Sequence, residues 1–154
     1  MVDVGANYSP ENNFSRATPP AKAVTGLLEA GVPLTRILLS SDGNGAPPKE
    51  ERREGQPAVA NYMPVGALHG TWRRLIVDEG LTPSDALQVV TADVADNAGL
   101  QRKGRIAPGM DADLVAFDHD WRIHTVIARG RVMVDAGKPV VRGMFDRIIL
   151  DQLG

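Results

Sequence analysis

A carboxylate follows directly on a short apolar run, at a position where parallel α/β proteins often carry out chemistry. The apolar run ILL continues into SSDGNG (Ser40–Gly45), whose acidic residue is Asp42. A carboxylate at the end of a strand can bind a divalent metal or accept a proton from water. Gly43 and Gly45 let the backbone approach a ligand closely, and the Asn44 amide can form hydrogen bonds. The same residues also fit an ordinary turn, because Asp-Gly and Asn-Gly are common turn dipeptides.

The three histidines are the other candidate metal ligands. His69 falls in a predicted helix, where a packed or exposed helical side chain is the simpler interpretation. His119 and His124 enclose the stretch HDWRIH, which could chelate a metal but also fits ordinary surface histidines in a turn and a strand. No His-x-His pair occurs, and the absence of cysteine excludes disulfides, thiolate metal sites and a cysteine nucleophile.

Alternating strands and helices in the first 100 residues would place Asp42 at the edge of a sheet. Strands are predicted at Val2–Tyr8 and Pro33–Ser40. The helix between them begins at Thr18–Pro20, where Thr can cap the helix and Pro suits the first turn, and it ends at Gly31. This strand–helix–strand order indicates a parallel sheet, in which functional groups gather at the carboxyl ends of the strands.

A long polar loop over residues 41–60 separates this unit from three further predicted helices. Loops of this length often form lids or binding segments. Helices are predicted over residues 64–79, 82–90 and 93–98, the second of them starting at Thr82-Pro83. The first domain is therefore expected to span residues 1–100.

The pattern changes to short strands and turns from Gly104 onward. We expect a strand before a Pro108-Gly109 turn, followed by strands at Ala112–Phe117, Ile123–Ala128, Val132–Val134 and Val140-Val141. Turns are expected near Arg129-Gly130 and Ala136-Gly137. Residues 101–154 are therefore predicted to form a small antiparallel β domain.

Composition narrows the class of protein. The 154 residues are 43% hydrophobic and 23% charged, with a formal net charge of −2, as in an ordinary globular domain. This charge favours neither nucleic acid nor an anionic membrane surface as a partner. No apolar run reaches the roughly 18 residues of a membrane span, and no signal segment is expected at Met1.

Three stretches resemble a single family. GVPLTRILLSSDGNGA is similar to the last barrel strand of the isoaspartyl dipeptidases (β-aspartyl peptidases), within the metal-dependent amidohydrolase superfamily. LTPSDALQVVTADVADNAGLQRKGRIAPGMDADLVAFD resembles the closing segment of that superfamily, and VIARGRVMVDAGKPVVRGMFD resembles the final hairpin of the family. The resemblance runs from about Val2 to Asp146, and SSDGNG points to this family rather than to dihydroorotases, hydantoinases or D-aminoacylases.

The resemblance implies a fold and a metal centre. The expected fold is α/β: the last two β/α units of a TIM-like (β/α)₈ barrel, followed by part of a small antiparallel β domain. The family's site holds two zinc ions, bridged by a carboxylated lysine and a hydroxide. Of its ligands only the aspartate of the eighth strand has a counterpart here, Asp42.

The resemblance also implies roles for the SSDGNG segment. Asp42 would bind one metal and carry the proton from the attacking water to the leaving amine. Gly43, Asn44, Gly45 and Ala46 would contact the dipeptide. Ala46 stands where similar sequences have serine, and losing one hydrogen bond to a charged group costs about 1.5–3 kcal/mol.

The expected function is therefore that of the C-terminal portion of a cytoplasmic, zinc-dependent isoaspartyl dipeptidase. It would hydrolyse the isopeptide bond of β-aspartyl dipeptides as a homo-oligomer or together with an N-terminal partner chain. The chain alone is expected to be inactive, because a single aspartate is too few ligands for zinc. Two alternatives stay open: a non-catalytic fragment or split-protein half that acts by binding an N-terminal partner, and another amidohydrolase resembling dihydroorotase or D-aminoacylase.

Overall fold

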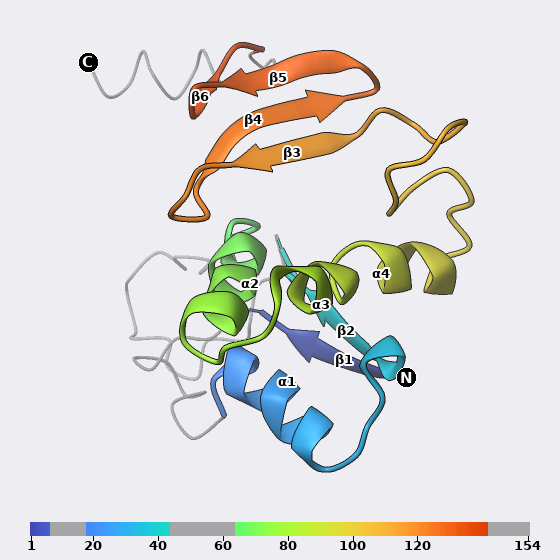
Figure 1. The fold of residues 1–154 in the computed structure, drawn as a ribbon, viewed down its shortest axis with the longest axis vertical. Helices are drawn as coiled ribbons and strands as arrows, with labels where there is room; N and C mark the ends of the chain where they lie inside the picture. The colour runs from blue at the N-terminus through green and yellow to red at the C-terminus, as the bar shows by residue number, and fades with distance from the viewer. Residues whose placement is uncertain (7–17, 44–63, 142–154) are drawn as a thin grey trace, which may run out of the picture. The chain divides into compact units, whose positions relative to one another are not determined.

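The chain divides into two compact units, Met1–Gly99 and Leu100–Gly154. The structure is a computed structural model, and it describes residues 1–6, 18–43 and 64–141. Figure 1 shows strands and helices in the first unit and a β meander in the second.

The first unit contains a pair of parallel strands, as the sequence predicts. β1 (Val2–Gly5) and β2 (Ile37–Ser40) pair in parallel, with Gly5 opposite Ser40 at their carboxyl ends. The predicted strand from Pro33 is too long, because the carbonyl of Pro33 accepts a hydrogen bond from the amide of Arg36. This bond closes the 3₁₀ turn η2 (Leu34–Arg36), so the strand begins only at Ile37.

Helix α1 (Pro20–Glu29) connects the two strands and begins in a way the sequence does not reveal. Its N-cap is Pro19 rather than Thr18, and the Pro19 carbonyl accepts the first helical hydrogen bond from the amide of Ala23. No side chain caps this end. At the other end, Gly31 adopts a positive φ of 84°, the conformation that commonly follows a helix.

Three more helices follow in the described part of the first unit: α2 (Ala67–Val77), α3 (Pro83–Gln88) and α4 (Ala92–Asn97). The predicted cap of α3 is confirmed, because Thr82 Oγ1 accepts a hydrogen bond from the Asp85 amide at 3.1 Å. Its Pro83 occupies the first helical turn, where the missing N–H costs nothing. The predicted polar loop falls largely on residues 44–63, outside the described residues.

The two faces of the strand pair differ in character. Ile37 and Leu39 are almost completely buried, together with Val24 of α1, Leu75 of α2 and Val89 next to α3. Because side chains alternate along a strand, the opposite face carries the other residues of each strand. These residues are Asp3, Gly5, Leu38 and Ser40.

The second unit contains a four-stranded antiparallel meander in the order β3-β4-β5-β6. The strands are β3 (Leu114–Phe117), β4 (Ile123–Ala128), β5 (Arg131–Asp135) and β6 (Lys138–Pro139). The tight turns fall as predicted, and their non-glycine residues, Arg129 and Ala136, both have positive φ. Residues 104–107 form no strand, and the last strand precedes the predicted Val140-Val141.

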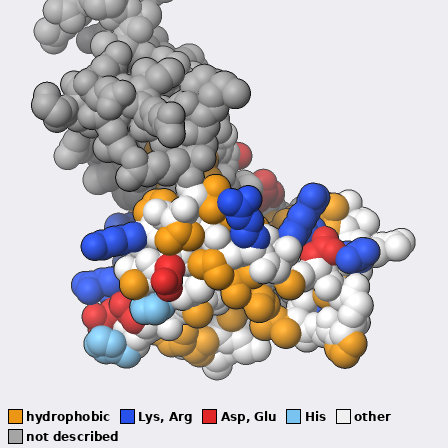
Figure 2. Space-filling view, turned by 90° about the horizontal axis from the view of Figure 1, so that it is seen from above, with side chains coloured by type: hydrophobic (Ala, Val, Ile, Leu, Met, Phe, Trp, Pro, Cys, Tyr) orange, Lys and Arg blue, Asp and Glu red, His pale blue; other side chains and the backbone are white. Residues whose placement is uncertain are grey.

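Both faces of the meander expose apolar side chains. Val115 pairs with Val126 and is 48% exposed, whereas Val132 pairs with Ile127 and is 41% exposed. Ile127 follows Val126 along the same strand, so these two pairs lie on opposite faces. Figure 2 shows hydrophobic side chains gathered on one face of the molecule. An antiparallel sheet with one face in water normally alternates apolar and polar residues, so this sheet is unusually apolar on the outside.

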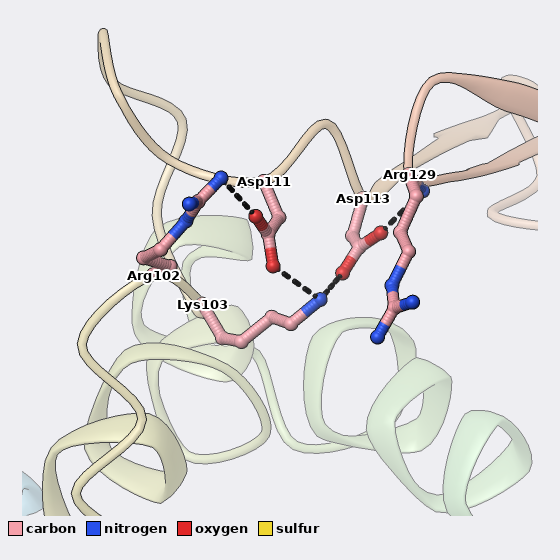
Figure 3. Close-up of polar contacts among 5 residues, drawn as sticks. All are labelled: Arg102, Lys103, Asp111, Asp113 and Arg129. Carbon is pink, nitrogen blue, oxygen red and sulfur yellow. Dashed lines mark hydrogen bonds and ion pairs between the residues drawn. The ribbon is translucent and has the colours of Figure 1, made fainter.

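A cluster of charged residues lies in and around the segment before β3 (Figure 3). It consists of Arg102, Lys103, Asp111, Asp113 and Arg129, and we call it the Lys103 clasp. Lys103 Nζ lies between the carboxylates of Asp111 and Asp113, at 2.9 Å from Asp111 Oδ2. Arg102 Nη2 contacts Asp111 Oδ1 at 2.6 Å, and the backbone amide of Arg129 donates to Asp113 Oδ1 at 2.7 Å. The cluster therefore joins the 102–113 segment to the β4–β5 turn.

Mutual attraction shifts the pKa values within the clasp. The hydrogen bond from Lys103 lowers the pKa of Asp111 below its usual value, and it does the same for Asp113, which also accepts from the Arg129 amide. The hydrogen bonds to Asp113 and Asp111 raise the pKa of Lys103. These ion pairs and the Arg129 hydrogen bond therefore favour the charged forms of all three side chains.

Among the described residues, no helix is long and apolar enough to cross a membrane. The sheet of the first unit has two strands in the described part of the chain, so these residues do not close a barrel on their own.

Candidate functional site

Asp42 lies just beyond the carboxyl end of β2, and its backbone has turned sharply. Its φ is +45°, a left-handed conformation that aspartate adopts more readily than most residues. The turn is held on both sides. The Ser40 carbonyl accepts a hydrogen bond from the Ala6 amide at 2.6 Å, and the Gly43 amide donates to Ser41 Oγ at 3.1 Å.

The Asp42 carboxylate extends back over the end of β1. A Cβ atom placed on Gly5 would lie 2.8 Å from Asp42 Oδ2, closer than such atoms approach one another in proteins. Gly5 is the strand partner of Ser40, so the carboxylate lies across the paired strand ends. Because Gly5 has no side chain, the Asp42 carboxylate can occupy the space above it.

A hydroxyl and a second carboxylate stand beside Asp42 on the same face. Ser40 Oγ donates to Asp3 Oδ2 at 2.9 Å and lies 3.4 Å from Asp42 Oδ1. Asp42 is exposed to solvent, whereas Ser40 is half-buried. The strand pair therefore presents two carboxylates and a shared hydroxyl at its open face.

Helix α2 fixes the end of β1 from the other side. Thr71 is buried, and its Oγ1 donates to the carbonyl of Ala6 at 3.2 Å. The segment leading into α2 also touches the turn, because a Cβ atom on Gly43 would lie 2.7 Å from Val65 Cγ2. A side chain at position 43 would therefore force Val65 to shift, whatever ligand the turn binds.

The remaining predicted substrate contacts, Asn44, Gly45 and Ala46, lie outside the described residues. The three histidines lie elsewhere. His69 is on α2, with its ring centroid 5.8 Å from that of Trp72. In the second unit, His119 contacts Asp120, and His124 Nδ1 lies 2.9 Å from Thr125 Oγ1.

The described residues do not assemble a metal site by themselves. Within residues 1–6, 18–43 and 64–141, no group of three or more His, Cys, Asp or Glu side chains could hold a metal ion. Asp42 can supply one exposed carboxylate, whereas zinc in proteins is usually held by three or four ligands. Any metal at these strand ends would therefore need further ligands.

The sequence alone indicates Asp42 and Gly43 as candidates, but it does not indicate that Asp3, Gly5 and Ser40 lie beside them. The available signal was the alternation of the valines in VDVG with Asp3 and Gly5. That alternation becomes meaningful only with the register, which sets Gly5 opposite Ser40. A short strand without a second apolar stripe leaves its register open in the sequence.

This combination of a parallel strand pair, covering helices and a carboxylate at the strand ends is typical of enzymes built on parallel α/β sheets. Residues 9–138 match the amidohydrolase family. The chain therefore belongs to the amidohydrolase family.

Individual relatives align over half or more of the chain. A β-aspartyl dipeptidase from Fervidobacterium islandicum AW-1, solved in complex with a β-Asp-Leu dipeptide, is 28% identical with a TM-score of 0.69 and aligns over 82% of this chain. An adenine deaminase from Methanothermobacter thermautotrophicus is 38% identical over 84 residues, or 51% of this chain. A variant of the Arthrobacter aurescens TC1 atrazine chlorohydrolase, complexed with zinc and atraton, is similar in fold, with 17% identity, a TM-score of 0.52 and alignment over 82% of this chain and 30% of its own.

The chain is much shorter than these relatives. It spans 32% of the β-aspartyl dipeptidase chain and 15% of the adenine deaminase.

Proposed function

We propose that this chain forms the C-terminal portion of a metal-dependent amidohydrolase that hydrolyses the isopeptide bond of β-aspartyl dipeptides. The observation that carries the proposal is the position of Asp42, whose carboxylate lies over the paired strand ends in a turn held by hydrogen bonds. The solved relative bound to β-Asp-Leu, similar over 82% of the chain, supports the substrate class.

In this proposal Asp42 moves a proton. Its carboxylate accepts a proton as water attacks the isopeptide carbonyl carbon, and a new C–O bond forms. It then donates the proton to the amine nitrogen as the C–N bond breaks, releasing aspartate and the second amino acid. The exposure of Asp42 suits this role, because water and substrate can reach it. A bound zinc ion would lower the pKa of water and polarise the carbonyl.

We further propose that residues 43–46 contact the dipeptide and that the remaining zinc ligands come from a preceding part of the same protein or from a partner chain. Homo-oligomer formation and a cytoplasmic location belong to the same proposal. Ala46 offers no hydroxyl, so we expect a weaker hold on the substrate carboxylate than a serine would give.

The test is a hydrolysis assay on the complete gene product that contains these residues, with zinc present. The expected result is release of leucine from β-Asp-Leu, at least a hundredfold slower in Asp42→Asn, because the amide cannot accept the proton. Asp135→Asn is the matched control: this aspartate is exposed on β5, and its change should leave the rate unaltered. Turnover by Asp42→Asn at the wild-type rate would contradict the assigned role.

A second candidate follows from the 38% identity to an adenine deaminase. The same assay with adenine in place of the dipeptide decides between the two. Ammonia release from adenine without dipeptide hydrolysis would replace the proposed substrate class while keeping Asp42 as the proton carrier. If the complete protein shows neither activity, the non-catalytic alternative is favoured. Measuring the binding of this chain to a separately produced N-terminal segment would then test that alternative.

A further inference from the structure

Ser40 holds its hydroxyl between two carboxylates. Its Oγ is 2.9 Å from Asp3 Oδ2 and 3.4 Å from Asp42 Oδ1, and it carries a single proton. The shorter contact, to Asp3, fixes the direction of the Ser40 side chain. The single proton is shared between both carboxylates in a three-centre hydrogen bond, whose shorter component goes to Asp3 and whose longer component goes to Asp42.

Asp3 is well placed to orient the Ser40 hydroxyl. It lies on β1 two residues before Gly5, on the same face as Ser40 and Leu38. Its strand is held at the carboxyl end by the Ala6 hydrogen bonds to Ser40 and Thr71. A carboxylate on a paired strand is a more rigid anchor than one on a loop.

Asp42, in contrast, lies in a left-handed turn and is exposed, with no strand pairing of its own. Its carboxylate could adopt other rotamers directed into solvent. Among the described residues, the contact with the Ser40 hydroxyl and the space over Gly5 favour the observed rotamer.

We propose that Asp3 and Ser40 are positioning residues for the Asp42 carboxylate: Asp3 orients the Ser40 hydroxyl, and Ser40 in turn holds Asp42 over Gly5. The expected effect of these residues on kcat rests on the proposed function. The structural content of the inference, one fixed Asp42 rotamer that depends on Ser40 and Asp3, stands independently of the substrate.

The variants separate a hydrogen bond from a charge. Ser40→Ala removes the hydroxyl, whereas Ser40→Thr keeps it. Asp3→Ala removes the acceptor, whereas Asp3→Asn keeps an acceptor oxygen and loses the charge. Asp135→Ala, at an exposed strand aspartate of the second unit, is the matched control for Asp3→Ala.

The experiment measures kcat and KM for β-Asp-Leu in the complete gene product and determines a crystal structure of each variant. Ser40→Ala and Asp3→Ala should lower kcat about tenfold or more with KM changed less than twofold or so, because misplacing a reacting group acts on the rate. Ser40→Thr and Asp3→Asn should recover most of that loss. The crystal structures should show Asp42 displaced in the two alanine variants.

Three results would overturn the inference: kcat within about twofold of wild type in both alanine variants, Asp42 in its original rotamer in their structures, or Asp3→Asn as impaired as Asp3→Ala. The last of these would show that the charge of Asp3, not its hydrogen bond to Ser40, is what matters. If the wild-type protein hydrolyses no β-aspartyl dipeptide, the proposed function fails. The rotamer of Asp42 in the crystal structures then decides the present inference alone.

Discussion

Replacing Gly5 with alanine should impair the site while leaving the fold intact. The added Cβ atom would lie 2.8 Å from Asp42 Oδ2 and 3.8 Å from Asp42 Cγ. Gly5 is not among the glycines with positive φ, so its backbone accepts alanine without strain. The clash is therefore with the far end of one side chain, which can move.

The size of the effect follows from this geometry. Relieving the clash requires Asp42 Oδ2 to move by roughly half an ångström, the limit within which catalytic groups must be held. A displacement of 1 Å can cost about a hundredfold in rate, so we expect a loss of about tenfold in kcat. Folding stability should change by less than about 1 kcal/mol, because alanine reduces the entropy of the unfolded chain and offsets the remaining repulsion.

Gly26→Ala is the matched control for this prediction. Gly26 lies within α1, and a Cβ atom there would meet nothing within 4 Å. This variant should gain about 0.5–1 kcal/mol in unfolding free energy and keep its activity. The two variants are compared by urea denaturation and by hydrolysis of β-Asp-Leu. Wild-type kcat in Gly5→Ala, with Asp42 unmoved in its crystal structure, would refute the reasoning.

Three other predictions concern stability and association. Because the pKa values of Asp111 and Asp113 are lowered, the Lys103 clasp contributes stability that is present above their ordinary pKa of 3.8 and is lost as pH falls through the lowered values. Because the pKa of Lys103 is raised, its contribution is fully present below its ordinary pKa of 10.5 and is lost as pH rises through the raised value. The protection of the Arg129 amide against hydrogen exchange, measured relative to the intrinsic rate at each pH, should therefore fall at acid pH and in Lys103→Met. Unchanged protection would contradict this. Thr82→Ala should lower the unfolding free energy by about 1 kcal/mol through loss of the α3 cap, whereas Ser84→Ala in the same helix should not. The isolated 154-residue chain should self-associate, because Val115 and Val132 expose apolar surface on opposite faces of the meander. Sedimentation velocity should show oligomers, and the oligomer fraction should be smaller in Val132→Lys. A monodisperse monomer would contradict the prediction.

The local elements could be predicted because their signals are local. Thr82-Pro83 marks the start of α3, and Gly31 marks the end of α1, since each acts through the hydrogen bonds or φ of its own neighbourhood. The errors arose where two local signals competed. Pro33 closes a 3₁₀ turn within an apolar run that otherwise suits a strand, and Thr18 gives way to the Pro19 carbonyl as the cap of α1.

The candidate site, too, could be predicted only in part. That a carboxylate, Asp42, follows an apolar strand and precedes a glycine can be predicted from the sequence, because strand, acid and glycine are neighbours along the chain. What surrounds that carboxylate depends on packing between distant segments. Gly5 and Asp3 lie more than thirty residues away in sequence, and the parallel register of β1 and β2 brings them to Ser40 and Asp42. Register depends on how α1 crosses over and on which strand face the helices bury, and these are properties of packing rather than of any one segment.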